Sequence, residues 1–191
     1  KGDILCLMHD DILIHTKKWG EILLDHFSKN SKTGLMGVAG SKIKTKMPSA
    51  WWDCPRKFKV VNITQHFNGK EKEKWQYGFK NGTDTEVVAI DGVFMGLRKN
   101  RNIRFDENLK GFHNYDLNIS LEYKIAGYSI FATNKIEIEH FSIGSINKCW
   151  YKSTLQFHKK YGKYLPLSRI ENIHKKQLKS LVLFFINSFH C

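Results

Sequence analysis

The chain has 191 residues, of which 41% are hydrophobic and 26% charged, a balance that excludes an intrinsically disordered protein and suits one domain with its own core. Lys and Arg number 31 against 18 Asp and Glu, and the net charge of +13 favours an anionic partner such as nucleotide phosphates, a lipid surface or nucleic acid. The four cysteines form no CxxC pair, which is typical of reduced, cytoplasmic proteins and not of a disulfide framework.

The first predicted element is a strand over residues 4–8, an unbroken apolar run. Such a run predicts a strand buried on both faces, as in a parallel sheet. It leads directly into His9, Asp10 and Asp11, and ligands bind at strand ends in open α/β sheets. Two adjacent carboxylates repel each other, so they indicate a divalent cation, although they would also serve as caps of a following helix.

A helix over residues 16–28 and a buried strand over residues 35–40 come next, and together with the first strand they form a βαβ unit. The loop over residues 42–59 carries Trp51 and Trp52. Two adjacent exposed tryptophans can form a platform on which a sugar stacks, or they can cover an edge of the core.

Short strands and helices alternate through the rest of the chain. A hairpin is predicted over residues 58–79, with its turn at Asn68-Gly69. The further strands are expected over residues 86–90, 93–97, 128–132 and 135–139, and the further helices over residues 116–126, 150–161 and 170–189. Asp91 and Gly92 follow the first of these strands, and His140 follows the last.

Residues 148–191 differ in composition from the rest, with nine Lys and Arg residues and the single acid Glu171. An apolar stripe beside clustered lysines can lie on an anionic membrane face, or the helices can pack on the domain with their lysines in water. We therefore expect a main domain over residues 1–147 and a basic helical extension over residues 148–191.

Five short motifs occur in a recognisable order: HDD at residues 9–11, DGxF at 91–94, FDExL at 105–109, GFHxYDL at 111–117 and IEH at 138–140. In this order they resemble a family-2-like glycosyltransferase of the GT-A fold, over about residues 1–145. The resemblance implies an α/β domain with a mixed, mostly parallel sheet flanked by helices. It also implies further N-terminal βα units that bind the base and ribose of the nucleotide. We therefore expect this sequence to be an N-terminally truncated domain, which can be inactive as a fragment.

The resemblance implies transfer of a sugar from a nucleotide-diphospho-sugar, in particular a UDP-sugar, to the hydroxyl of a glycan or lipid-linked acceptor. A divalent cation, Mn²⁺ or Mg²⁺, would neutralise the diphosphate. Asp11 maps to the carboxylate that meets the metal, and His140 to a second metal ligand. Asp10 would lie near the ribose or orient the site, and His9 stands where the family usually has Asp.

Asp116 maps to the general base of an inverting transfer and is the only carboxylate of its motif. It opens a helix, whose dipole is expected to keep it deprotonated, although an acid in the first turn is also a common cap. Asp91 and Gly92 would contact the donor sugar, or they would only form a tight turn. His113 would lie against the sugars, where it polarises the acceptor or only fills space. Trp51 and Trp52 would line the acceptor side.

A different class of function, a basic nucleic-acid-binding module without catalysis, would also explain the charge. The lysines gather in the tail, however, and no RNP-like or helix-turn-helix pattern appears, so no nucleic-acid partner is expected. We expect instead an inverting, hexosyltransferase-type enzyme of glycan or surface-polysaccharide synthesis. It would be cytoplasmic, in peripheral contact with an anionic membrane.

Overall fold

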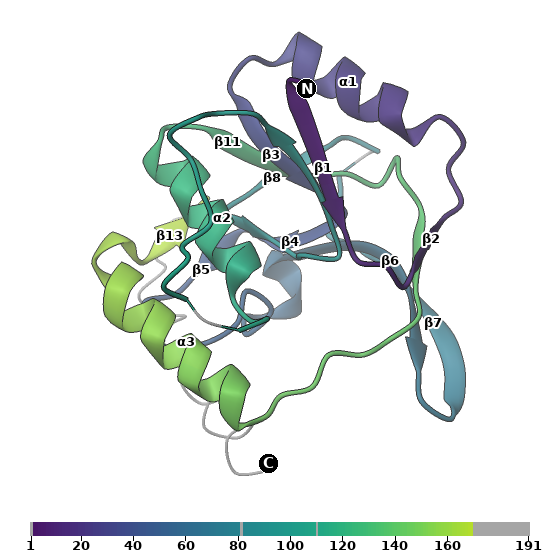
Figure 1. Cartoon of the computed structure of the whole chain (residues 1–191). Helices are drawn as coiled ribbons and strands as arrows, with labels where there is room; N and C mark the ends of the chain where they lie inside the picture. The colour runs from purple at the N-terminus through teal and green to yellow at the C-terminus, as the bar shows by residue number, and fades with distance from the viewer. Residues whose placement is uncertain (1, 81, 110, 170–191) are drawn as a thin grey trace.

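The computed structural model describes residues 2–80, 82–109 and 111–169, whose strands form three sheets (Figure 1). The five-stranded sheet has the order β1-β10-β3-β11-β8. Its strands are β1 (Ile4–Met8), β3 (Thr33–Gly37), β8 (Thr85–Val87), β10 (Phe94–Arg98) and β11 (Ser129–Ala132).

The six-stranded sheet has the order β2-β12-β6-β4-β9, with β7 paired to β6. Its strands are β2 (Ile12–Ile14), β4 (Ala39–Ser41), β6 (Lys59–Phe67), β7 (Lys70–Tyr77), β9 (Ala89–Ile90) and β12 (Ile138–His140). A small sheet pairs β5 (Ile43–Lys44) with β13 (Leu167–Ser168), and two 3₁₀ turns are η1 (Arg56–Phe58) and η2 (Gly162–Tyr164).

The predicted mixed α/β architecture is confirmed, and it is compatible with a GT-A-like domain. The expectation of mostly parallel strands is wrong. Among the pairings between named strands of the described residues, only β3 with β11 and β6 with β12 are parallel. Most antiparallel pairs join strands that are far apart in the sequence, such as β1 with β10 and β2 with β12, whereas β6 and β7 form a hairpin.

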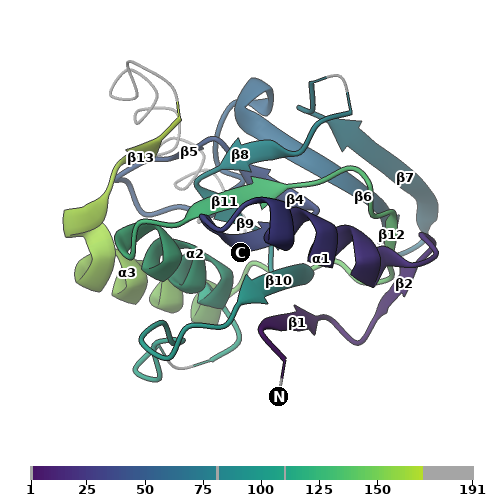
Figure 2. The same cartoon turned by 90° about the horizontal axis from the view of Figure 1, so that it is seen from above.

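The helices α1 (Trp19–Lys29), α2 (Tyr115–Ile125) and α3 (Lys148–Tyr161) confirm three predicted helices with small shifts. Leu23 and Phe27 of α1 pack with Met36 on one face of the five-stranded sheet. Ile119 of α2 packs with Leu35 on the other face, since neighbouring residues of a strand point to opposite faces. Figure 2 shows α2 and α3 side by side.

Several predicted strands change at their boundaries. The run over residues 35–40 divides at Val38 into β3 and β4, and that over residues 86–90 divides at Val88 into β8 and β9. Each half enters a different sheet, so these runs join the two larger sheets. The hairpin is confirmed as β6 and β7.

β1 is an edge strand and not the doubly buried central strand that its sequence predicts. It pairs with β10 alone, in the antiparallel direction. Leu5, Leu7 and Met8 are exposed, whereas Ile4 and Cys6 pack against the core. An apolar run does not reveal whether both faces are covered, because the cover comes from elements elsewhere in the chain.

α3 packs on the domain although it lies in the segment predicted as a basic extension. Phe157 and Tyr161 belong to the main core cluster, and Lys152 and Lys159 are exposed. In the described part of the chain no helix is long and apolar enough to cross a bilayer. The helix predicted over residues 170–189 lies outside the described residues, and both the boundary after residue 147 and the membrane contact stay predictions.

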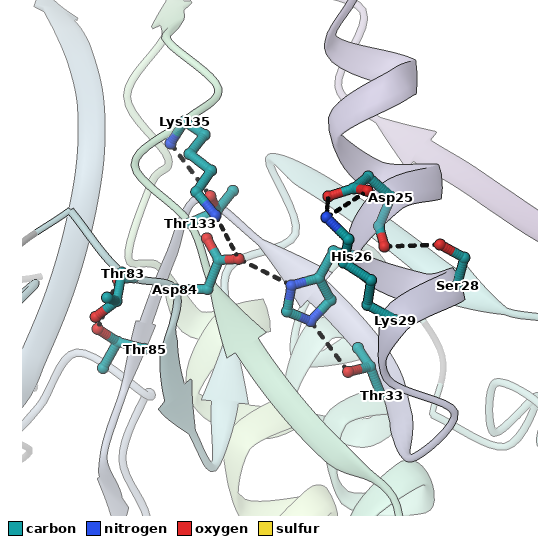
Figure 3. Close-up of polar contacts among 10 residues, drawn as sticks. All are labelled: Asp25, His26, Ser28, Lys29, Thr33, Thr83, Asp84, Thr85, Thr133 and Lys135. Carbon is teal, nitrogen blue, oxygen red and sulfur yellow. Dashed lines mark hydrogen bonds and ion pairs between the residues drawn. The ribbon is translucent and has the colours of Figure 1, made fainter.

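A half-buried polar network ties α1 to the sheet (Figure 3). His26 Nδ1 lies 2.8 Å from Asp84 Oδ2 and His26 Nε2 lies 3.0 Å from Thr33 Oγ1, while Lys135 Nζ donates to Asp84 Oδ2 over 3.0 Å. Burial alone would raise the pKa of Asp84, but hydrogen bonds from His26, Thr133 and Lys135 outweigh it and lower the pKa to about 2. The ionised carboxylate therefore stabilises the fold.

Asp84→Asn is expected to lower the free energy of unfolding by about 2 kcal/mol at pH 7, from roughly 1.36 kcal/mol per pKa unit. Because the folded-state pKa is depressed, this stability is complete above the unfolded pKa of about 4 and is lost as the pH falls towards 2. Urea unfolding at several pH values should show the gap between the two proteins closing below pH about 4.

Asp25→Asn provides a matched control on α1, the helix that carries His26. Asp25 pairs with Lys29 over 2.8 Å, but both side chains are more than half exposed. Its removal should change the free energy of unfolding by at most about 0.5 kcal/mol. Equal losses of unfolding free energy in the two variants would show that the network around Asp84 stabilises the fold no more than an exposed ion pair does.

Candidate active site

Three potential metal ligands converge where β1, β2 and β12 meet. His9 follows β1, Asp11 precedes β2 and His140 ends β12, which pairs with β2. Asp11 Oδ1 lies 3.4 Å from His140 Nε2 and 3.8 Å from His9 Nδ1. One ligand atom from each residue lies within 4.8 Å of the others. The structure thus brings the two predicted ligands together and adds His9.

Gln65 orients the imidazole of His140. Gln65 Nε2 donates to the carbonyl oxygens of Ser142 (2.6 Å) and His66 (2.9 Å), so its Oε1 must face His140 Nδ1, 3.0 Å away. His140 Nδ1 therefore carries the proton, and the lone pair of Nε2 points into the cluster. Such a hydrogen bond on the far nitrogen is the usual support of a metal-binding histidine.

Tyr115 holds the imidazole of His9 in place. The Tyr115 hydroxyl lies 2.8 Å from His9 Nε2, and His9 Nδ1 lies 3.2 Å from His140 Nε2. His9 was missed as a ligand because the sequence shows it only as a departure from an expected carboxylate. Its position directly before two aspartates was the available signal.

The pKa shifts of Asp11 and His140 suit the binding of a cation. Burial alone would raise the pKa of Asp11, but a hydrogen bond from Ser142 and the neighbouring His140 lower it overall. Burial lowers the pKa of His140, chiefly by disfavouring the charged imidazolium. A metal needs an ionised carboxylate and neutral imidazoles, and two imidazoles with one carboxylate suit Mn²⁺ better than Mg²⁺.

Gly92 makes room for Tyr115. A Cβ atom at position 92 would lie 2.1 Å from the Tyr115 hydroxyl oxygen and 2.4 Å from Cζ. The sequence predicted that this glycine admits the donor sugar, whereas the structure shows the tyrosine in that space. Gly92 therefore supports the position of His9 indirectly, because it leaves space for the Tyr115 ring that contacts His9.

Gly92→Ala is expected to displace Tyr115 from His9, to destabilise the fold by about 1–3 kcal/mol and to weaken metal affinity by about 10- to 100-fold. Gly20→Ala is the control, since nothing lies within 4 Å of a Cβ at that position of α1. Thermal unfolding and Mn²⁺ titration would measure both effects. Unchanged metal affinity in folded Gly92→Ala would show that Tyr115 does not support His9.

Asp91 and Asp116 form a second acidic group next to this cluster. Asp91 interacts electrostatically with both Asp116 and His140. The Asp116 carboxylate accepts hydrogen bonds from the backbone N–H groups of Leu117 (2.8 Å) and Gly92. Asn114, in the left-handed conformation at φ 61°, precedes α2 and turns the chain into this position.

The expectation that the helix dipole keeps Asp116 deprotonated is wrong. Burial and the neighbouring charge of Asp91 raise the pKa of Asp116 to about 7, despite three backbone hydrogen bonds that oppose the shift. The carboxyl group is therefore balanced between its two forms near neutral pH. A general base works best with its pKa near the working pH, so the shift is compatible with the predicted role.

The two tryptophans differ from the exposed platform predicted. Trp51 is buried, and its Nε1 donates to Asp91 Oδ2 over 3.1 Å. Trp52 is half-buried, with its ring centroid 6.3 Å from that of Trp150. Trp51 therefore holds a carboxylate of the site, and the pair covers the core as in the alternative reading.

The remaining predicted residues lie at the margin. Asp10 is exposed in the bend between β1 and β2. Because a strand follows, Asp10 and Asp11 do not cap a helix there. His113 is half-buried, its carbonyl accepts from Ser153 Oγ over 3.0 Å, and burial lowers the pKa of its ring.

Comparison with known families gives a match over most of the chain. Residues 3–164 match the model of a family described as "Glycosyltransferase like family". The matched range contains the metal-ligand cluster, the acidic pair and α3. Comparison with the curated proteins finds no match.

Proposed function

Because the chain belongs to the glycosyltransferase-like family, we propose that it transfers a sugar from a nucleotide-diphospho-sugar, in particular a UDP-sugar, to a hydroxyl acceptor with inversion and metal dependence. The observation that carries this proposal is the cluster of His9, Asp11 and His140 beside the acidic pair of Asp91 and Asp116. The family match favours this transferase over a nucleic-acid-binding module.

The residues of the cluster fit a divalent cation of the Mn²⁺ type. His9 Nδ1, Asp11 Oδ1 and His140 Nε2 are the atoms that would hold it, and Tyr115 and Gln65 orient the two imidazoles. When bound, the cation would neutralise the charge that builds up on the departing nucleoside diphosphate.

Asp116 is the proposed base. Its carboxylate takes the proton of the acceptor hydroxyl as that oxygen forms the new bond to the anomeric carbon. The bond from this carbon to the diphosphate oxygen breaks on the opposite face, so the configuration inverts. The electron pair leaves with the nucleoside diphosphate, and no cofactor is oxidised or reduced.

Asp91 is the proposed contact to the donor sugar. Its Oδ1 accepts from Val93 N over 2.8 Å and its Oδ2 from Trp51, so the carboxylate is fixed in direction. Its charge also raises the pKa of Asp116. Asp10 and His113 stay proposed contacts to the ribose and to the sugars, and the proposed location remains the cytoplasmic side of an anionic membrane.

The proposal is tested by incubating the chain with a panel of UDP-sugars and Mn²⁺ and measuring the release of UDP, with EDTA as the metal-free control. NMR of the product would give the anomeric configuration. We expect metal-dependent release and an inverted product. Release that EDTA does not affect would contradict metal dependence, and a retained configuration would contradict Asp116 as the base.

A further inference from the structure

Asn114 joins the N-terminal end of α2 to α3, which lies beside it (Figure 2). The side-chain Nδ2 of Asn114 donates to Ser153 Oγ over 3.0 Å and to Thr154 Oγ1 over 3.3 Å. Ser153 Oγ in turn donates to the carbonyl oxygen of His113 over 3.0 Å. Two hydroxyl groups of α3 therefore hold the two residues that directly precede α2.

We call Asn114, Ser153 and Thr154 the α3 link. All three residues are buried. A buried polar group without a partner is destabilising, so each member of the link depends on the others for its hydrogen bonds. The α3 link is therefore a fixed contact between the two helices, and not a surface contact that water can replace.

Asn114 departs from the local structure that its residue type favours. Asn is preferred at the position before a helix, where its side-chain oxygen usually accepts from a backbone N–H group of the first turn. The carbonyl of Asn114 does accept from Asn118 N over 2.9 Å, but its side chain makes no such cap. Its backbone lies in the left-handed region, at φ 61° and ψ 13°, a conformation that persists where the surroundings hold it. The side chain thus serves the contact with α3 instead of the cap of α2.

The two residues that follow Asn114 both reach the site. The Tyr115 hydroxyl lies 2.8 Å from His9 Nε2, and the Asp116 carboxylate accepts from the backbone N–H of Gly92. Tyr115 and Asp116 are the first residues of α2, so a rotation of the backbone at residue 114 would move both side chains together. The conformation of Asn114 therefore sets the direction in which the support of His9 and the proposed base enter the site.

We propose that Asn114 is a positioning residue for the transfer reaction, and that α3 acts through it on Tyr115 and Asp116. This inference rests on the proposed function, in which Tyr115 supports the metal ligand His9 and Asp116 is the base. The α3 link transfers no proton and contacts no reacting atom. It fixes the start of α2, and a small displacement of groups around a reacting centre can lower a rate by about 100-fold.

Asn114→Gly separates the side chain of Asn114 from its backbone conformation, because glycine adopts a positive φ freely but has no amide to bind α3. Ser153→Ala removes the hydroxyl that contacts both Asn114 and His113, and this small change keeps the test decisive if Asn114→Gly does not fold. Gln156→Ala is the matched control on α3. Gln156 is exposed, and its Nε2 donates to the Asn108 carbonyl oxygen over 2.9 Å, a contact with the segment before α2 that does not involve Asn114.

Three measurements are made on each protein. The ¹⁵N chemical shifts of the His9 ring, in the chain alone, report the contact with the Tyr115 hydroxyl and require no activity. Calorimetry gives the Mn²⁺ affinity, and UDP release at saturating UDP-sugar and Mn²⁺ gives kcat. Thermal unfolding shows that each variant is folded at the temperature of the other measurements.

We expect Asn114→Gly and Ser153→Ala to change the His9 shifts, to weaken Mn²⁺ binding by about tenfold and to lower kcat by about 10- to 100-fold. Gln156→Ala should match the wild type in all three measurements. A purely structural role would lower the melting temperature of the variants but leave these quantities unchanged below it, and that result would overturn the inference.

Wild-type values in folded Asn114→Gly would also overturn it, because the left-handed backbone alone would then be sufficient. Equal losses in Gln156→Ala and Ser153→Ala would overturn it as well, since any contact of α3 would then have the same effect. His9 shifts that change only in the variants of the α3 link, in a chain that neither binds Mn²⁺ nor releases UDP, would support Asn114 as the residue that positions Tyr115 but contradict the proposed function.

Discussion

Asp116→Asn is expected to lower the rate of transfer by about 100- to 10,000-fold while donor binding stays near wild type. Asparagine keeps the size of the side chain and can still accept the hydrogen bond from Leu117 N, but it cannot take the acceptor proton. The loss should therefore appear in kcat and not in the Kd of UDP. Retention of most of the turnover would exclude Asp116 as the base.

The pH dependence of the wild-type rate tests the proposed role of Asp116 independently. The base acts in its deprotonated form, and burial with the nearby Asp91 raises the pKa of Asp116 to about 7. The rate should therefore rise with pH through about 7 and then level off. Asp91→Asn removes the neighbouring charge, so it should move the rise to lower pH. A rate that is flat from pH about 5 to 8 would contradict the assignment.

Asp11→Ala and His140→Ala are each expected to weaken Mn²⁺ binding by more than about 100-fold, since loss of an orienting partner alone costs about 10- to 100-fold. Each variant removes one of three converging ligand atoms. His15→Gln is the control, because His15 binds Glu139 and lies outside the cluster. Calorimetry would measure the Mn²⁺ affinity of all three variants. A loss of affinity in the control alone would show that the metal site lies elsewhere.

His9→Asp extends this prediction. The substitution replaces an imidazole by the carboxylate that the family usually has at this position. Oxygen ligands suit Mg²⁺ better than imidazole does, so the ratio of Mg²⁺ to Mn²⁺ affinity should rise. An unchanged ratio would indicate that His9 does not reach the cation.

The sequence predicted the meeting of Asp11 and His140 better than the sheet that supports them. Asp11 and His140 were predicted as ligands because each lies in a short motif of the resemblance, directly after a predicted strand. The direction and burial of β1 could not be predicted in this way, since the apolar run ending at Met8 fits either a central or an edge strand. The structure shows that β1 pairs with β10 alone and that the side chains of Leu5 and Leu7 are exposed.

The orientation of His9 depends on contacts between distant parts of the chain. His9 and Tyr115 are 106 residues apart, and the tyrosine can approach only because residue 92 lacks a Cβ. Neither the motif at residues 9–11 nor that at 111–117 contains this information by itself. Similarly, nothing local distinguishes the buried Trp51, whose Nε1 binds Asp91, from an exposed stacking residue.

The raised pKa of Asp116 also depends on contacts that the local sequence does not contain. Its place in the first turn of α2 predicts stabilisation of the charge by the helix dipole, and three backbone hydrogen bonds do act in that direction. Burial and the charge of Asp91, which comes from the other side of the site, are larger. Local sequence therefore predicted the wrong direction for the shift in the pKa of Asp116.

Calorimetric titration of Mn²⁺ into the chain and its Asp11→Ala variant, with and without UDP, tests the central claim most directly. We predict that the chain binds Mn²⁺, that UDP tightens this binding, and that the substitution abolishes it. Such a result would establish a site for a metal and a nucleoside diphosphate at His9, Asp11 and His140. A folded chain that binds no Mn²⁺, or one whose binding is indifferent to both UDP and Asp11→Ala, would contradict the account.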